Sequence, residues 1–496
     1  MLFLIKVFPE IIIKSRPVRQ RFVRQLRKNI RVTLQDLDSA VLTRGEWDSI
    51  EVTTEITDES ILRQMTERLG CIPGISVFLE TVKYPLPEMS EIVELAKAAY
   101  EEQLVGKTFA VRCKRAGKHE FRSVDVERIV GSGLMLGTQA KGVKLVNPEV
   151  TVQLEIRNKE LYVVRRQHQG LGGFPLGCQD AVLSLISGGF DSSVSSYLCI
   201  KRGLQTHYCF FNLGGKAHEL AVKELALFLW MKYHTSHRVK FVSVPFEGVV
   251  EEILTKVDNS HMGVVLKRMM LRAADKVAAQ LHIPALATGE SVAQVSSQTL
   301  LNLAVIDKVA ESLVLRPLCT VDKQDIIDLA RRIGTEDFSR NIPEYCAVIS
   351  NKPTTKAKLD RVEYEESKFD FTILDESIKN ASFQLITELL QTDAAQPIEV
   401  SVVSDVAVDD VIIDIRHPAE LEMRPLRLPA TAAGAKVLSI PFYQLRSGFD
   451  QLDRQQRFLL YCEKGMMSRL HAAHLQDEGF ANVAVLALPT NAELPK

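Results

Sequence analysis

The residues most able to do chemistry form one short loop of glycines, hydroxyl groups and a single acid. In order they are Ser187, Gly188, Gly189, Phe190, Asp191, Ser192 and Ser193. The apolar run 181–186 before them predicts a buried parallel strand, and residues 194–202 after them have helical spacing. Backbone N–H groups therefore converge at a helix N-terminus, which favours a pyrophosphate. We expect this loop to bind ATP, with Asp191 helping to hold the accompanying Mg2+.

The same loop has a purely structural interpretation, in which Gly188 and Gly189 turn a strand into a helix and Ser192 and Ser193 cap that helix. A structural turn needs neither the acid nor the neighbouring hydroxyls, so nucleotide binding is the stronger hypothesis. The loop also lacks the lysine of the G-x-x-x-x-G-K-[ST] motif, which assists γ-phosphoryl transfer. Cleavage between the α- and β-phosphates of ATP, with release of pyrophosphate, fits these residues better.

A second stretch able to do chemistry lies near the C-terminus. The apolar run 458–461 leads into Cys462 and a short loop, and an amphipathic helix is expected over 470–477. Loop amides, a helix N-terminus and the cations Lys464 and Arg469 favour an ionised thiol, which is the nucleophilic form. The same surroundings can stabilise a persulfide anion. The alternatives are a buried, inert cysteine and a phosphatase-like loop in which Arg469 binds a phosphate.

Length and composition indicate a protein of several domains without membrane association. At about 150 residues per domain, 496 residues suffice for three or four domains. The formal net charge is -1, yet residues 1–31 hold nine Lys or Arg and one acid, Glu10. The start is a poor signal peptide and no apolar run approaches 18 residues, so we expect a cytoplasmic protein. Eight cysteines without C-x-x-C pairs predict no zinc or iron–sulfur site.

The N-terminal third alternates short strands and helices, which predicts small α+β modules. Residues 2–7 predict a strand, and a helix opening at Pro17 carries apolar residues on one face and cations on the others. These cations are Arg16, Arg19, Arg21, Arg24, Arg27 and Lys28. A second basic stretch follows at 109–122, with Lys141 and Lys144 beyond it. A solvated basic face is the alternative, but two separate basic stretches favour binding to the backbone of structured RNA.

A second glycine-rich stretch, 131–137, superficially matches the dinucleotide-binding fingerprint G-x-G-x-x-G. Its third glycine comes one position late, and no clear strand and helix surround it. We therefore predict an ordinary loop there.

From residue 182 onward, apolar runs alternate with helical stretches and predict a doubly wound parallel sheet. The expected strands are 182–186, 207–211, 239–244 and 284–287. Ligand contacts in such a sheet come from the carboxyl ends of its strands. Lys267, Arg268, Gly289 and the polar stretch 294–299 follow suitable elements and are candidate ATP contacts. Ordinary surface positions are the alternative interpretation of each of them.

Taken together, these parts resemble the tRNA 4-thiouridine synthetase family over nearly the whole chain. That family combines ferredoxin-like and THUMP RNA-binding modules, a PP-loop ATP pyrophosphatase domain and, in longer members, a rhodanese-like domain. The Ser187–Ser193 loop matches the PP-loop, and the rhodanese pattern is matched by Asp414, Ile415, Arg416, Pro418, Glu420 and the Cys462 loop. The resemblance implies a ferredoxin-like domain at 1–60, a THUMP domain at 61–168, a PP-loop domain at 177–395 and a rhodanese-like sulfurtransferase domain at 404–496.

The resemblance also implies a reaction, in which O4 of the uridine at position eight of tRNA is adenylated and then replaced by sulfur. A carbonyl oxygen is a poor leaving group and AMP is a good one. Cys462 would carry the sulfur as a persulfide received from a cysteine desulfurase, and Cys346 would form a disulfide with Cys462 to release it. Asp191 is implied as the acid important for activation. The implied ATP-contacting positions are Leu185, Ile186, Lys267, Gly289 and Gln298.

Partners follow from the same resemblance. The expected partners are tRNA and the desulfurase, and a homodimer is compatible with this scheme. Members with a rhodanese-like domain also supply sulfur for the thiazole of thiamine, which implies a sulfur-carrier protein of that pathway. Two other functions stay open: a small-molecule ligase or amidotransferase, and a sulfur carrier that acts through its last domain alone. Pyrophosphate exchange that requires tRNA would exclude the first of these, and loss of 4-thiouridine on Asp191→Ala would exclude the second.

Overall fold

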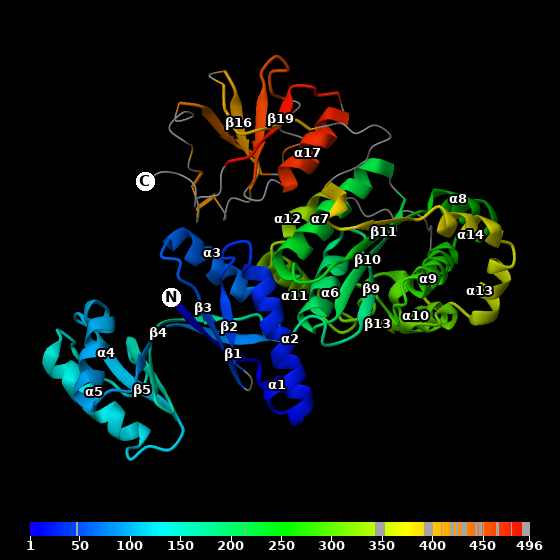
Figure 1. Cartoon of the computed structure of the whole chain (residues 1–496). Helices are drawn as coiled ribbons and strands as arrows, with labels where there is room; N and C mark the ends of the chain where they lie inside the picture. The colour runs from blue at the N-terminus through cyan, green and yellow to red at the C-terminus, as the bar shows by residue number, and fades with distance from the viewer. Residues whose placement is uncertain are drawn as a thin grey trace. The chain divides into compact units, whose positions relative to one another are not determined.

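A computed structural model of the chain describes residues 1–45, 48–213, 215–342, 353–390, 400–407, 409–416, 434–441, 451–462, 466–477 and 479–488, with a few single positions and short pieces between 421 and 449. The described residues form two compact units, whose course along the chain can be followed in Figure 1. The first unit comprises 1–180 with 199–205 and 232–237, and the second comprises the rest.

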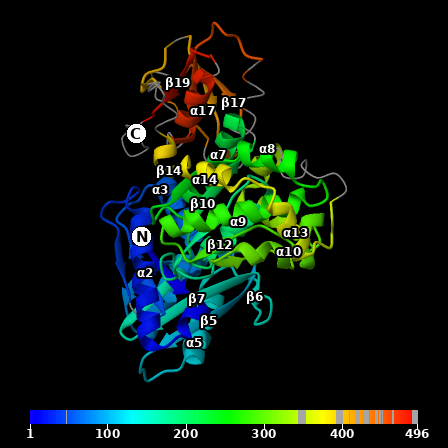
Figure 2. The same cartoon turned by 90° about the vertical axis from the view of Figure 1, so that its right-hand side faces the viewer.

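One eight-stranded sheet forms the centre of the first unit. Its strand order is β2-β3-β1-β4-β8-β7-β5-β6, and the end with β7, β5 and β6 can be seen in Figure 2. The strands are β1 (Leu2–Val7), β2 (Leu42–Arg44), β3 (Ser49–Thr53), β4 (Ile75–Pro85), β5 (Thr108–Ala116), β6 (Gly142–Val143), β7 (Val150–Arg157) and β8 (Glu160–Gln169). β1 has the bounds expected from the sequence. β4 pairs antiparallel with both β1 and β8, so the two α+β modules share one continuous sheet.

Five helices belong to this unit among its described residues. They are α1 (Pro9–Ile12), α2 (Arg16–Leu34), α3 (Glu59–Gly70), α4 (Met89–Leu104) and α5 (Ser123–Gly137). The expected apolar face of α2 is confirmed, since Phe22, Leu26 and Ile30 are buried. Each such burial contributes roughly 2 kcal/mol of hydrophobic free energy. Arg21 and Arg24 are exposed, so the basic face of α2 is accessible to solvent.

The loop predicted at 131–137 is wrong, because these residues form the C-terminal half of α5, which packs against α4 (Figure 1). A Cβ added at Gly133 would lie 2.3 Å from Cγ1 of Val93 on α4. Glycine therefore permits an approach of the two helices that a larger residue would prevent. Its low helix propensity favoured a loop in the sequence, and packing overrides that preference.

A six-stranded sheet of order β13-β12-β9-β10-β11-β14 lies in the second unit. Its strands are β9 (Ala181–Leu185), β10 (Gln205–Asn212), β11 (Lys240–Pro245), β12 (Ala285–Ala287), β13 (Leu313–Leu315) and β14 (Ser382–Leu385). The four strands expected from the sequence are confirmed as β9 to β12, with small shifts at their ends. β12 pairs in parallel with β9 and β13, β10 pairs in parallel with β11, and β14 runs antiparallel at the edge.

Helices cover both faces of this sheet, so the doubly wound architecture is confirmed. Alternate residues of β10 face opposite sides: Phe210 belongs to an apolar cluster with residues of α7, and Phe211 to one with residues of α9. The helices are α6 (Phe190–Lys201), α7 (Gly215–Tyr233), α8 (Glu247–Lys256), α9 (Met262–Gln280), α10 (Leu300–Ile306), α11 (Lys323–Ile333), α12 (Glu336–Asn341), α13 (Leu359–Glu366) and α14 (Phe371–Lys379).

The C-terminal part of the second unit contains a five-stranded sheet of order β15-β19-β18-β16-β17, in which all strand pairs are parallel. Its strands are β15 (Val402–Val403), β16 (Val411–Asp414), β17 (Lys436–Ser439), β18 (Phe458–Tyr461) and β19 (Val483–Leu486), and α17 (Met466–Asp477) follows β18. The expected strand and helix on either side of Cys462 are therefore confirmed. Among the residues that the structure describes, no helix combines the length and the apolar character needed to cross a membrane.

The packing of α4 on α5 makes a testable prediction at Gly133. We expect Gly133→Ala to lower the free energy of unfolding of the first unit by about 1–2 kcal/mol, because the stiff side chain of Val93 has to move. Urea denaturation measures this difference. Gly142→Ala is the matched control, since a Cβ there meets no atom within 4 Å. Unchanged stability of the Gly133 variant would contradict the packing argument.

Candidate functional site

The loop after β9 presents the N-terminus of α6 to ligands. α6 begins at Phe190, and its first backbone bond joins the N–H of Ser193 to the carbonyl of Gly189, 3.2 Å. Gly188 has a φ of +91°, and a Cβ there would lie 2.7 Å from Cδ1 of Ile342. The N–H groups of the first turn have no partner within the helix. This arrangement can accept an anion such as a phosphate.

The loop hydroxyls form bonds within the loop. Oγ of Ser192 accepts the N–H of Ser187, 3.2 Å, and donates to the carbonyl of Gly189, 3.1 Å. Ser193 is fully buried, and its Oγ donates to the carbonyl of Phe190, 2.9 Å. In this structure the hydroxyls of Ser192 and Ser193 therefore fix the shape of the loop.

Gly289 brings a second loop against the first. β12 lies beside β9, with Leu286 opposite Leu183, so the carboxyl ends of both strands meet at one edge. A Cβ at Gly289 would lie 2.6 Å from the carbonyl carbon of Asp191 and 2.7 Å from the N of Ser192. Only glycine allows the two backbones to approach this closely. The sequence predicted Gly289 as an ATP contact, and its backbone lies against the 187–193 loop.

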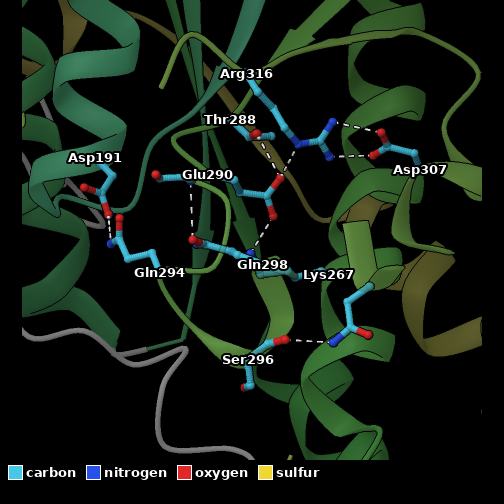
Figure 3. Close-up of polar contacts among 11 residues, drawn as sticks. Asp191, Lys267, Thr288, Glu290, Gln294, Ser296, Gln298, Asp307 and Arg316 are labelled. Atoms are coloured by element: carbon cyan, nitrogen blue, oxygen red, sulfur yellow. Dashed lines mark hydrogen bonds and ion pairs between the residues drawn. The ribbon is translucent and has the colours of Figure 1, made fainter. Parts of the chain in front are cut away.

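Asp191 receives two hydrogen bonds from outside its own loop, and the one from Gln294 is drawn in Figure 3. Its Oδ2 accepts Nε2 of Gln294 at 2.7 Å, and its Oδ1 accepts Nζ of Lys323 at 2.7 Å. Lys323 is the first residue of α11 and its side chain is 41% exposed. Sequence reasoning missed Lys323, which has no motif around it. Only the arrangement of the sheet brings it to Asp191.

A second cluster of polar side chains surrounds Glu290, as Figure 3 shows. Its carboxylate accepts Nζ of Lys267 at 2.5 Å, Nε of Arg316 at 2.8 Å and the hydroxyl of Thr288 at 3.1 Å. Arg316 also binds Asp307, with 2.8 Å between its Nη1 and Oδ2. Burial alone would raise the pKa of Glu290, but Lys267 and Arg316 outweigh it and hold that pKa below its ordinary value. Glu290 is therefore an anion that positions two cations.

The other expected ATP contacts have different surroundings. Gln298 is 9% exposed, and its Oε1 accepts the N–H of Ser291 at 3.3 Å, so it fixes the loop after β12. Leu185 is partly buried at the end of β9, and Ile186 is 2% exposed, with its N–H donating to the carbonyl of Cys209 at 2.9 Å. For these two residues, backbone atoms are the groups able to meet a ligand.

Arg268 lies away from this edge of the sheet. Its side chain is 2% exposed, and its guanidinium binds Glu366 through two bonds of 2.5 and 2.8 Å and the carbonyl of Val305 at 2.6 Å. Because this guanidinium is buried, it presents no donor to a phosphate in solvent. We therefore correct the expectation that Arg268 contacts ATP. Its side chain links α9 to α13 and does not belong to the candidate site.

Cys462 lies between β18 and the N-terminus of α17. It is 9% exposed and belongs to an apolar cluster, yet its Sγ accepts the backbone N–H of Ser468 at 3.3 Å and lies 3.4 Å from Oγ of that serine. Ser468 is in the first turn of α17, so the sulfur meets the positive end of a helix. Such a contact favours a thiolate or a persulfide anion over the neutral thiol.

An ion pair borders the Cys462 site. Arg416 donates to Asp414 through Nε at 2.9 Å and Nη2 at 2.6 Å, with both side chains buried. The guanidinium lies 5.1 Å from the ring centre of Tyr461, the residue before Cys462. The predicted Asp414–Arg416 motif is thus brought beside the cysteine. Cys346, Pro418, Glu420 and Lys464 lie outside the described residues.

Comparison with known proteins identifies the family. A family profile described as Thiamine biosynthesis protein (ThiI) matches 177–371, a THUMP domain matches 87–164 and a ThiI ferredoxin-like domain matches 2–78. Proteins named tRNA sulfurtransferase are 54% identical in Pseudomonas fluorescens and Azotobacter vinelandii and 55% in Pseudomonas aeruginosa, each over 98% of this chain and 99% of the relative. The chain belongs to the tRNA sulfurtransferase family.

Solved structures agree with this family at the level of the fold. A 4-thiouridine synthetase in complex with RNA and bound ATP is similar with a TM-score of 0.67 and 24% identity, over 77% of this chain and 99% of that one. A protein of Pyrococcus horikoshii has a TM-score of 0.50 and 16% identity, over 67% of this chain and 100% of its own. The ferredoxin-like match runs to residue 78, beyond the expected end at 60, and includes the start of β4, which pairs with β1.

The contact at Gly289 yields a prediction about tRNA sulfurtransferase activity. We expect Gly289→Ala to lower this activity by at least roughly tenfold, because a small displacement of the α6 N-terminus disturbs the reacting groups. An assay of sulfur incorporation into tRNA measures it. The control is Gly248→Ala, where the nearest atom to an added Cβ, on Ile373, lies at an ordinary 3.6 Å. Full activity of the Gly289 variant would argue against the site.

The lowered pKa of Glu290 predicts a pH-dependent stability. A carboxyl whose folded pKa is depressed stabilises the fold above its unfolded pKa, and this contribution is lost as the pH falls through the folded pKa. We expect Glu290→Gln to lower the free energy of unfolding by about 3 kcal/mol at pH 7. The difference from wild type should shrink once the pH falls below 4.5, the ordinary pKa of glutamate.

Urea denaturation at a series of pH values tests this expectation. Exposed Glu311 on the same unit gives the control Glu311→Gln, whose stability should follow wild type throughout. A difference between Glu290→Gln and wild type that stays constant through acid pH would contradict the assignment.

Proposed function

We propose that this chain is an ATP-dependent tRNA uridine 4-sulfurtransferase, which adenylates O4 of the uridine at position eight and replaces that oxygen with sulfur. The observation that carries the proposal is the 187–193 loop, where the backbone of Gly289 approaches the N-terminus of α6. Family membership supports it, as does the similar fold of a 4-thiouridine synthetase solved with RNA and ATP. Under this proposal 4-thiouridine is the product.

ATP would bind at this edge of the sheet, against Leu185, Ile186, Lys267, Gly289 and Gln298 and the amides of the 187–193 loop. The unpaired N–H groups of α6, with Lys267 and Lys323 nearby, suit a triphosphate. Mg2+ prefers oxygen ligands and commonly uses one carboxylate together with phosphates. The carboxylate of Asp191, 18% exposed, fits that role. Bound there, Mg2+ would neutralise phosphate charge as pyrophosphate departs.

Cys462 would supply the sulfur. Its Sγ accepts the N–H of Ser468, a contact that can stabilise a persulfide anion received from a cysteine desulfurase. Attack of the sulfane sulfur on C4 of the adenylated uridine would expel AMP. Cys346 would then attack Sγ of Cys462 and break its bond to the transferred sulfur, which stays on C4 as 4-thiouridine, and an external reductant would restore both thiols from the resulting disulfide.

The basic stretches would bind tRNA. The exposed cations of α2 and the stretch 109–122 can contact phosphates, which agrees with a ferredoxin-like domain at 1–60 and a THUMP domain at 61–168. A PP-loop domain at 177–395 and a rhodanese-like domain at 404–496 would perform the two chemical steps. A small-molecule ligase would have no use for these stretches or for Cys462. Sulfur supply for thiamine thiazole would need Cys462 but not the ATP loop.

Two substitutions separate the two chemical steps. We expect Asp191→Asn to lower the rate of tRNA-dependent ATP–pyrophosphate exchange by at least roughly 100-fold, because asparagine lacks the carboxylate that would hold the metal. We expect Cys462→Ser to retain exchange and form no 4-thiouridine, since activation precedes sulfur transfer. Exchange of labelled pyrophosphate and mass spectrometry of tRNA nucleosides measure the two outcomes.

The control is Asp325→Asn, which removes an exposed carboxylate in the first turn of α11 and should leave both steps intact. Formation of 4-thiouridine by the Asp191 variant would point to a sulfur carrier without ATP chemistry. Exchange that proceeds equally without tRNA would point to a small-molecule ligase.

A further inference from the structure

The loop between β12 and α10, residues 288–298, is fixed at several points. Gln294 binds Asp191, and Oε1 of Gln298 accepts the N–H of Ser291. Ala293 has a φ of +65°, a conformation that residues other than glycine rarely adopt. A loop with such a residue needs surroundings that enforce its shape.

Asn302 on α10 provides one of these fixed points without belonging to the loop. Its side chain is fully buried, and its Nδ2 donates to the carbonyl of Ser296 at 2.8 Å. This bond is drawn in Figure 3 below the Glu290 group. Ser296 lies between Gln294 and Gln298 in the chain, so this bond fixes the backbone of the stretch that carries both glutamines.

The same amide binds a distant part of the chain, the 354–357 segment. Nδ2 of Asn302 donates a second time, to the carbonyl of Thr354 at 2.8 Å, and Oδ1 accepts the N–H of Ala357 at 2.9 Å. Both donors and the acceptor of the amide are thus used. An amide of this kind cannot be replaced by an apolar or hydroxyl side chain without leaving buried polar groups unpaired.

Two further bonds connect the 354–357 segment with elements of the candidate site. Thr299 caps α10 by accepting the N–H of Asn302 at 3.3 Å, and its hydroxyl donates to the carbonyl of Thr355 at 2.8 Å. The N–H of Thr354 donates to the carbonyl of Ser260 at 2.9 Å, just before α9, the helix of Lys267. The segment therefore contacts the first turn of α10 and the residues just before the Lys267 helix.

We propose that Asn302 is a positioning residue for ATP, acting through the carbonyl of Ser296 on Gln294 and Gln298. This inference rests on the proposed function, because it assigns the 288–298 loop to the ATP site. Asn302 orients the loop toward Asp191 and ties it to the 354–357 segment. Its loss weakens ATP binding although its side chain does not contact the nucleotide.

The test compares ATP kinetics with stability. Asn302→Ala removes all three side-chain bonds, and the expected result is a roughly tenfold rise in the KM for ATP in tRNA-dependent pyrophosphate exchange, with kcat changed by less than about threefold. Thr299→Val is a milder second variant at a partly exposed position. It removes the Thr355 bond and the cap on the N–H of Asn302 but leaves the Asn302 side chain in place, and it should raise the KM for ATP about threefold.

The matched control is Asn29→Ala in the first unit. Asn29 is 1% exposed and its Nδ2 donates to the carbonyl of Leu176 at 3.0 Å. Its side-chain amide is therefore as buried as that of Asn302, but it lies far from Asn302 in the sequence. Its loss should lower the melting temperature and leave the KM for ATP unchanged.

The experiment distinguishes a failure of the inference about Asn302 from a failure of the proposed function. If Asn302→Ala lowers the melting temperature like Asn29→Ala and keeps the wild-type KM for ATP, Asn302 is only structural and the inference is wrong. If the wild-type enzyme itself neither binds ATP nor exchanges pyrophosphate, the proposed function is wrong, and the inference falls with it.

Discussion

The close approach of Gly289 to the first turn of α6 is the constraint on which the candidate site depends. β9 and β12 are neighbouring parallel strands, so the loops at their carboxyl ends must share one edge of the sheet. The absence of a side chain at Gly289 lets the second loop reach the backbone of Asp191 and Ser192. From that contact the chain continues to Gln294, whose side chain binds Asp191 in the first turn of α6.

The charged side chains near this contact are held in place by ion pairs. Glu290 follows Gly289 directly and binds both Lys267 and Arg316, so its negative charge offsets the repulsion between two cations near this edge of the sheet. The neighbouring Arg268 has a different role, because successive residues of a helix point about 100° apart. Lys267 remains partly exposed while Arg268 enters the core and pairs with Glu366. One turn of α9 therefore serves the site and the fold at once.

The same physical device occurs a second time in the chain. At α6 the N-terminus of a helix follows a buried parallel strand and presents backbone N–H groups to an anion, and at α17 it follows β18 and meets the sulfur of Cys462. An oxygen anion and a sulfur anion need the same partner, a group of donors fixed by backbone geometry. Under the proposed function, this similarity would let two different chemical steps be built on two α/β sheets of one polypeptide.

The sequence by itself determined the strands β9 to β12, the apolar face of α2, the 187–193 loop and the strand and helix around Cys462, because periodicity and turn chemistry act over a few residues. It could not reveal the pairing of Lys323 with Asp191, or of Arg316 with Glu290, since these partners meet only after the strands have taken their order in the sheet. Nor could it show that Arg268 is internal or that 131–137 is helical. Those outcomes are decided by packing between separate helices, α5 on α4 and α9 on α13, which overrides local preference.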